Sequence, residues 1–137
     1  MHAFPGVHDV LGVLQASGFA LGLITNGSGP VQREKIERFS LAPFFAHIQI
    51  EGEHGFGKPE ERAYRHALAS LNVEPRDMWI VGDNLVWEVE APQKLGIHAV
   101  WYDAERKGLP SGSVVTPDKV IRRHDELLTM LGVLPRA

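Results

Sequence analysis

The sequence predicts an α/β fold in which a parallel sheet lies between two layers of helices. Apolar, strand-like runs alternate along the chain with stretches of helical periodicity, which is the pattern of a parallel sheet covered on both faces. The 137 residues, 44% hydrophobic and 23% charged, suffice for one domain that buries its own core. We find no internal repeat, low-complexity segment or linker, so we expect a single domain over residues 1–137.

The first half of the chain predicts two helices and two strands. In order, these are a helix from Val7 to a stop at Gly18, a strand over 20–25, a helix over 30–39 and a strand over 47–51. The strand over 20–25 is continuously apolar and ends in a turn-prone segment, as a buried parallel strand does. Pro30 suits the first turn of a helix. The alternating strand over 47–51 is expected nearer the sheet edge.

The second half predicts a similar alternation. The expected elements are a Gly-rich loop over 52–57, a helix after Pro59, a strand over 78–81, a helix from Leu85 to Leu95, a strand over 98–102, a loop over 108–117 and a closing helix over 120–131. Glu60 and Glu61 suit the positive end of the helix after Pro59. Gly96 is the expected stop of the helix from Leu85 to Leu95.

Composition excludes several function classes. With 14 Lys+Arg against 17 Asp+Glu, a net charge of -3 and no basic cluster, we expect no nucleic-acid partner. The absence of cysteine excludes disulfides, thiolate catalysis and cysteine-based zinc sites. No apolar run approaches a membrane span, and Met1–Gly6 is not a signal peptide. We therefore expect no membrane association and a cytoplasmic location.

Three polar side chains follow strands or precede helices where a ligand would bind. In open parallel sheets, ligands bind outside the carboxyl ends of the strands. Thr25 ends one strand, Asp83 follows another, and Lys58 precedes the Pro59 helix. The N–H groups of residues 26–28, just ahead of a helix, form a ready anion site. The alternative interpretations are a plain turn capped at Ser28 and a solvated loop lysine.

Asp83 and Glu88 form a candidate cation site. They lie five positions apart across a strand-to-helix turn, and two neighbouring carboxylates repel unless a cation lies between them. Oxygen ligands alone suit Mg²⁺. The alternative is a helix cap at Asp83 and a helix-dipole interaction at Glu88. The seven histidines show no helical metal-site spacing, so we interpret them as surface or core residues.

Taken together, these motifs resemble the haloacid-dehalogenase-like hydrolases, most of which are phosphatases. The matching segments are 23–27, 57–60 and 80–84 with Glu88, and the likeness covers nearly the whole chain. The resemblance implies a three-layer, Rossmann-like core and Mg²⁺-dependent hydrolysis of a small phosphorylated molecule. It implies catalytic roles for Thr25 and Lys58. The residues that it implies would bind phosphate are Thr25, Asn26, Gly27 and Lys58. It implies that Asp83 and Glu88 would hold Mg²⁺.

The sequence also departs from that family. There, an N-terminal strand ends in an Asp-x-Asp pair that supplies the nucleophile and the general acid/base. The 137 residues contain no Asp-x-Asp, and neither Asp9 nor Asp103 is placed to replace it. We therefore expect an incomplete core that lacks the first strand and the cap domain of the family. We expect this core to be inactive as it stands.

In the family, that strand lies between two others, which correspond here to the strand that ends at Thr25 and the strand that Asp83 follows. Its absence predicts one of two outcomes: the two strands pair directly, or a second chain covers their exposed edges, as in a homodimer. Two other functions stay open at this point. One is a non-catalytic phosphate-binding or protein-interaction module derived from the fold, and the other is an unrelated flavodoxin-like domain.

Overall fold

The computed structural model describes residues 6–133, so residues 1–5, and with them most of the Met1–Gly6 segment, lie outside it, as do residues 134–137. The strands of the described residues form two parallel sheets. β1 (Gly22–Thr25) pairs with β2 (His47–Ile50). β3 (Trp79–Gly82), β4 (His98–Tyr102) and β5 (Lys119–Ile121) form the second sheet in that order.

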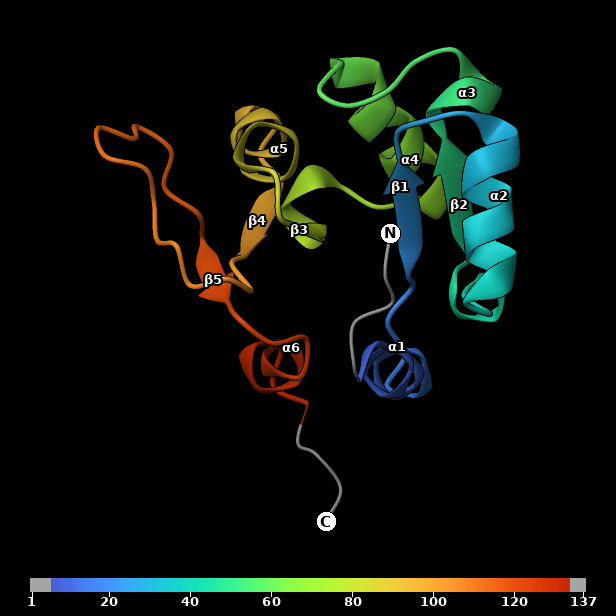
Figure 1. The fold of residues 1–137 in the computed structure, drawn as a ribbon, viewed down its shortest axis with the longest axis horizontal. Helices are drawn as coiled ribbons and strands as arrows, with labels where there is room; N and C mark the ends of the chain where they lie inside the picture. The colour runs from blue at the N-terminus through green and yellow to red at the C-terminus, as the bar shows by residue number, and fades with distance from the viewer. Residues whose placement is uncertain (1–5, 134–137) are drawn as a thin grey trace.

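Helices lie on both faces of these strands, as the sequence predicts. They are α1 (Val7–Ala16), α2 (Gly29–Arg38), α3 (Glu51–His54), α4 (Glu61–Leu71), the π-helical turn η3 (Val86–Glu90), α5 (Ala91–Lys94) and α6 (Glu126–Met130), with short 3-10 turns η1 (Ala42–Phe44) and η2 (Pro75–Asp77). In Figure 1, α4 and α5 lie on one side of the strands and α1 and α6 on the other. Within residues 6–133, no helix is both long and apolar enough to cross a bilayer.

Two helices, α1 and α4, each pack against both sheets. On one face, α4 packs against β1 through Ile24 and against β3 through Ile80, around the fully buried Tyr64. On the other face, α1 contributes to the cluster around β1 and β2 and, through Val10, to the cluster around Val100 of β4. Burial of apolar side chains from both sheets against shared helices therefore holds the described residues together.

The strands that end at Thr25 and Gly82 do not pair with each other, so direct pairing, the first of the two expected outcomes, is wrong. Within residues 6–133, β1 pairs only with β2, and β3 pairs only with β4. The edge position leaves β3 accessible: Trp79 is 38% exposed and Val81 37%, whereas Val100 of the neighbouring β4 is fully buried. Both strands pack against α4 although no ladder joins them in the described residues.

Three elements differ from the sequence prediction. The Gly-rich loop over 52–57 begins as the short helix α3, and the helix from Leu85 starts as the π-helical turn η3. The closing helix over 120–131 is wrong in its first half, because residues 119–121 form β5. The backbone N–H groups of Arg122 and Arg123 donate to the Glu126 carboxylate before α6 begins. The same apolar residues face the core whether the segment is the predicted helix or the observed β5 and α6. Periodicity alone therefore does not separate a short strand from the end of a helix.

Candidate functional site

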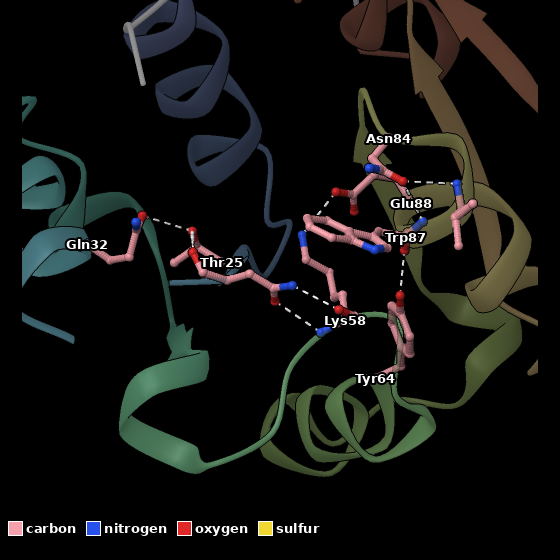
Figure 2. A network of polar contacts seen from close by, with 9 residues as sticks. Thr25, Gln32, Lys58, Tyr64, Asn84, Trp87 and Glu88 are labelled. Atoms are coloured by element: carbon pink, nitrogen blue, oxygen red, sulfur yellow. Dashed lines mark hydrogen bonds and ion pairs between the residues drawn. The ribbon is translucent and has the colours of Figure 1, made fainter. Parts of the chain in front are cut away.

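A network of polar contacts lies at the carboxyl ends of β1 and β3 (Figure 2). It includes Thr25 at the end of β1, Lys58 in the loop between α3 and α4, and Glu88 in η3. The sequence places these residues in three separate motifs. The fold brings Lys58 into contact with the segment after β1 and with η3 after β3.

Asn26 binds the backbone of Lys58 through both ends of its side-chain amide. Its Nδ2 donates to the Lys58 carbonyl at 2.8 Å, and its Oδ1 accepts from the Lys58 N–H at 3.0 Å. Lys58 precedes a proline, which favours an extended backbone there. The preceding Gly57 has no room for a side chain, because a Cβ would lie 2.8 Å from Asn26 Oδ1.

The Lys58 ammonium reaches Glu88. Lys58 Nζ lies 3.0 Å from Glu88 Oε1, and the two side chains are only 9% and 10% exposed. The ammonium also lies 5.9 Å from the centre of the Trp87 ring. Burial raises the pKa of Glu88, the Lys58 charge and hydrogen bond oppose this, and the charge of Asp83 raises it further. Hydrogen bonding and attraction to the ammonium offset only part of the cost of burying the Glu88 carboxylate.

The turn that carries Glu88 is held from two sides. Asn84 Oδ1 accepts from the N–H groups of Val86 at 3.1 Å and Trp87 at 3.0 Å, which satisfies donors at the start of η3. The hydroxyl of Tyr64, on α4, donates to the Trp87 carbonyl at 2.6 Å. The position of Glu88 is therefore fixed by contacts with α4 as well as by its own turn.

The residues proposed for phosphate binding already have partners. Thr25 Oγ1 donates to Gln32 Oε1 at 3.0 Å, and the Gly27 N–H donates to Glu51 Oε1 at 3.0 Å. A carboxylate oxygen thus occupies one of the N–H donors that the sequence assigns to an anion. Sequence reasoning missed Gln32 and Glu51. The one available signal is that Gln32 lies in the first turns of the helix that follows the Thr25 strand.

Asp83 lies at the same edge but outside the hydrogen-bonded chain. It follows β3 directly and is exposed, and its backbone carbonyl accepts from Trp101 Nε1 at 2.9 Å. Its charge acts on Glu88, as the pKa of Glu88 indicates. Within the described ranges, no group of three or more His, Asp or Glu side chains is arranged to hold a metal ion. Asp83 and Glu88 thus remain a pair of candidate ligands, with Glu88 also bound to Lys58.

A surface hollow of about 240 Å³ lies between α4 and the η3–α5 segment. Its lining includes Pro59, Val86 and Lys94 but none of Thr25, Lys58, Asp83 or Glu88. The polar network, and not this hollow, therefore contains the chemistry that the sequence singles out.

Comparison with known proteins matches residues 1–102 to the family described as haloacid dehalogenase-like hydrolase. The chain is 38% identical over 116 residues to a phosphoserine phosphatase of Thermus thermophilus, covering 84% of this chain and 45% of that protein. It is 35% identical over 98 residues to a glyceraldehyde 3-phosphate phosphatase of Pyrococcus furiosus, covering 72% and 41%.

Solved structures give the same result. A HAD phosphatase from Thermococcus onnurineus superposes with a TM-score of 0.86 at 27% identity, over 96% of this chain and 59% of that one. The magnesium-bound HAD-hydrolase YfnB from Bacillus subtilis gives 0.85 at 26% identity, over 93% and 55%. The chain thus spans about half the length of these relatives. The alternative of an unrelated flavodoxin-like domain is wrong, because a family model covers most of the chain.

Proposed function

Because this chain belongs to the haloacid dehalogenase-like hydrolases, we propose that it forms the phosphate-binding part of a phosphatase-type hydrolase. The proposed substrate is a small phosphorylated molecule, in keeping with the names of the phosphatases it is similar to. The observation that carries the proposal is the shielded Lys58 ammonium, held at the carboxyl ends of β1 and β3 beside Asn26 and Glu88.

In this proposal, the phosphoryl group binds between the end of β1 and Lys58. The Thr25 hydroxyl and the N–H groups of Asn26 and Gly27 donate to its oxygens, with Gly27 exchanging Glu51 for the ligand. Lys58 supplies a positive charge that offsets the phosphate charge. Thr25, Asn26 and Gly27 lie at or just after the end of β1, and contacts with Asn26 and Glu88 bring Lys58 to the same edge. Open parallel sheets bind ligands at this edge.

The donor set fits Mg²⁺ in part. Asp83 and Glu88 offer oxygen ligands, and Mg²⁺ is commonly held by one or two carboxylates together with substrate phosphate and water. We infer that Asp83 and Glu88 would hold the ion, whose charge would stabilise a phosphoryl group bound at this edge. The protein's own part is to keep Glu88 between Asp83 and Lys58, so that the carboxylate balances the ammonium.

We propose that the 137-residue chain has negligible turnover by itself. The family mechanism needs an Asp-x-Asp pair, which these residues do not contain, and a covalent mechanism without its nucleophile retains only binding and electrostatic effects. The check is hydrolysis of p-nitrophenyl phosphate with Mg²⁺. Robust Mg²⁺-dependent turnover by this chain would contradict the proposal.

We also propose that a second copy of the chain covers the edges of β1 and β3 that have no ladder within residues 6–133, so that the protein is a homodimer. Unpaired strand edges with accessible apolar side chains favour association with another chain. The exposed Trp79 and Val81 of β3 support this.

Phosphate binding itself is tested with inorganic phosphate, followed by NMR titration of backbone amides. Lys58→Met is expected to weaken binding about tenfold, which corresponds to ~1.4 kcal/mol. The matched control is Lys94→Met, which removes a lysine that also pairs with a glutamate, Glu90, at 3.4 Å but is 72% exposed. Its affinity for phosphate should not change.

Lys58→Met leaves the buried Glu88 carboxylate without its partner, which commonly destabilises a fold. The double variant Lys58→Met/Glu88→Gln removes both charges and keeps the test available if the single variant does not fold. Phosphate binding by the double variant with wild-type affinity would overturn the role of Lys58.

A further inference from the structure

The chain of contacts from Asn26 through Lys58 to Glu88, here called the Asn26–Lys58–Glu88 bridge, connects the two sheets at their carboxyl edge. Asn26 directly follows β1 of the first sheet, and Glu88 lies in the turn after β3 of the second. Lys58 belongs to neither sheet and contacts both residues. Because β1 and β3 share no ladder in the described part of the chain, the location of Lys58 depends on these side-chain contacts.

The amide of the Asn26 side chain matches the hydrogen-bonding groups of the Lys58 backbone. An amide has an acceptor oxygen and a donor nitrogen side by side, so it can satisfy both the N–H and the C=O of one extended residue. The partners also fix the orientation of the amide, since the Lys58 N–H must donate to Oδ1 and the carbonyl must accept from Nδ2. Alanine offers neither group, and serine offers one hydroxyl.

The glycines on either side of the bridge leave space for it. A Cβ on Gly57 would lie 2.6 Å from Glu51 Oε2 and 2.8 Å from Asn26 Oδ1. A Cβ on Gly82 would lie 2.5 Å from Glu88 Cδ. Both ends of the bridge are therefore closely packed against backbone that carries no side chain, which restricts where Asn26 and Glu88 can lie.

Fixing the Lys58 backbone has a consequence for its ammonium. A lysine side chain is a flexible stem with about 2 kcal/mol of rotamer entropy, so its charge is localised only when both ends are held. Glu88 holds the ammonium at 3.0 Å, and Asn26 holds the backbone end with two hydrogen bonds. Loss of Asn26 removes both hydrogen bonds to the Lys58 backbone and leaves the ion pair with Glu88.

We propose that Asn26 is a positioning residue whose side chain holds Lys58 where its ammonium can bind a phosphoryl group. This inference rests on the proposed function, and it gives the Asn26 side chain a role separate from that of its backbone N–H. Asn26 then acts on phosphate through Lys58 and not by direct side-chain contact.

A double-mutant cycle tests this directly, with inorganic phosphate as the probe and the 137-residue chain as the protein. Asn26→Ala is made in two backgrounds, the wild type and Lys58→Met/Glu88→Gln. In the wild-type background we expect phosphate affinity to fall about tenfold, and in the uncharged background not at all. Residues that act through one another show such non-additivity, whereas independent residues do not.

Two further variants separate positioning from general stability. Gln93→Ala removes another amide that donates to a backbone carbonyl, that of Thr116 at 2.8 Å, and should lower stability without changing phosphate affinity. Asn26→Ser keeps one hydroxyl in place of the separate donor and acceptor atoms of the amide, so it should lose less affinity than Asn26→Ala. Asn26→Ser also serves if the alanine variant does not fold.

The outcomes distinguish this inference from the proposed function. Equal weakening by Asn26→Ala in both backgrounds would mean that Asn26 acts on phosphate itself, which overturns the positioning role and leaves phosphate binding intact. Equal phosphate affinity of the wild type and the uncharged background would overturn the proposed function and the positioning role with it.

Discussion

The Lys58–Glu88 pair is the residue-scale feature on which the site depends. Both side chains are about nine-tenths shielded from solvent at an N–O separation of 3.0 Å. Moving two charges out of water costs free energy that their attraction repays only with good geometry, and apolar replacements of such pairs are often neutral or stabilising. A shielded pair at the ends of β1 and β3 is therefore better explained by the charge it holds in place than by stability.

Gly82 gives a direct test of how closely this pair is packed. We expect Gly82→Ala to destabilise the protein by about 1–3 kcal/mol, the usual cost of overpacking, because the new Cβ would lie 2.5 Å from Glu88 Cδ and still closer to Cγ. Urea denaturation measures the change. The control is Gly12→Ala within α1, where a Cβ would lie 3.8 Å from Phe44; alanine is the better helix former, so stability should hold or rise.

A second background separates the steric contact with Glu88 from backbone effects as the cause of the destabilisation by Gly82→Ala. In a Glu88→Ala background, the obstructing side chain is gone, so Gly82→Ala should cost clearly less than in the wild type. An equal cost in both backgrounds would show that the close approach to Glu88 is not what excludes alanine at this position.

At the residue scale, the sequence predicts which groups gather at the edge but not how they pair. Thr25, Lys58 and Asp83 are identifiable because each lies next to a strand end or helix start. The sequence assigns Glu88 to a cation, and in the structure it binds Lys58. That contact depends on the side-chain directions of residues 30 positions apart, which strand and helix periodicity does not determine.

At the scale of elements, strongly patterned segments were predictable and short ones were not. The continuous apolar run before Thr25 gives β1, and the apolar face of residues 61–71 gives α4. Residues 119–121 and 126–130 share one apolar pattern, yet they divide into β5 and α6. Pairing with β4 and the hydrogen bonds from the Arg122 and Arg123 N–H groups to Glu126 outweigh helical spacing. Such a division depends on tertiary contacts.

A cluster of histidines joins three elements and predicts a dependence of stability on pH. The His66 ring of α4 lies 4.8 Å from that of His54 at the end of α3 and 5.5 Å from that of His47 on β2. Burial lowers the pKa of His66, and His54 and His47 lower it further. The unfolded chain, with an ordinary histidine pKa of about 6.5, then binds more protons than the folded chain in mildly acidic solution.

We therefore expect the histidine contribution to the free energy of unfolding to decrease as pH falls below about 6.5, since stability decreases with falling pH wherever the unfolded state binds more protons. Burial also lowers the pKa of His124, so His66→Gln should reduce the decrease without abolishing it. The loss of stability is measured from urea denaturation midpoints at about pH 7.5 and about pH 5.5, which bracket the ordinary pKa of histidine. An unchanged decrease in His66→Gln would contradict a contribution from the cluster.

At the scale of the whole molecule, two parallel sheets share helices, and no ladder joins them within residues 6–133. α4 packs on β1 and β3 from one side, and α1 reaches the clusters of both sheets from the other. Parallel strands are normally buried on both faces. The partial exposure of Trp79 and Val81 departs from that rule at the strand that faces β1.

This departure predicts concentration-dependent self-association through the strand edges. We expect sedimentation equilibrium to show a monomer–dimer equilibrium for the wild type, and a monomer for Val81→Lys, because a charged side chain on an edge strand opposes pairing with another chain. Val114→Lys is the matched control: Val114 is 95% exposed and lies outside every strand, so the same charge there should leave the equilibrium unchanged. A wild-type protein that stays monomeric at all concentrations, or equal effects of the two lysines, would contradict association through β3.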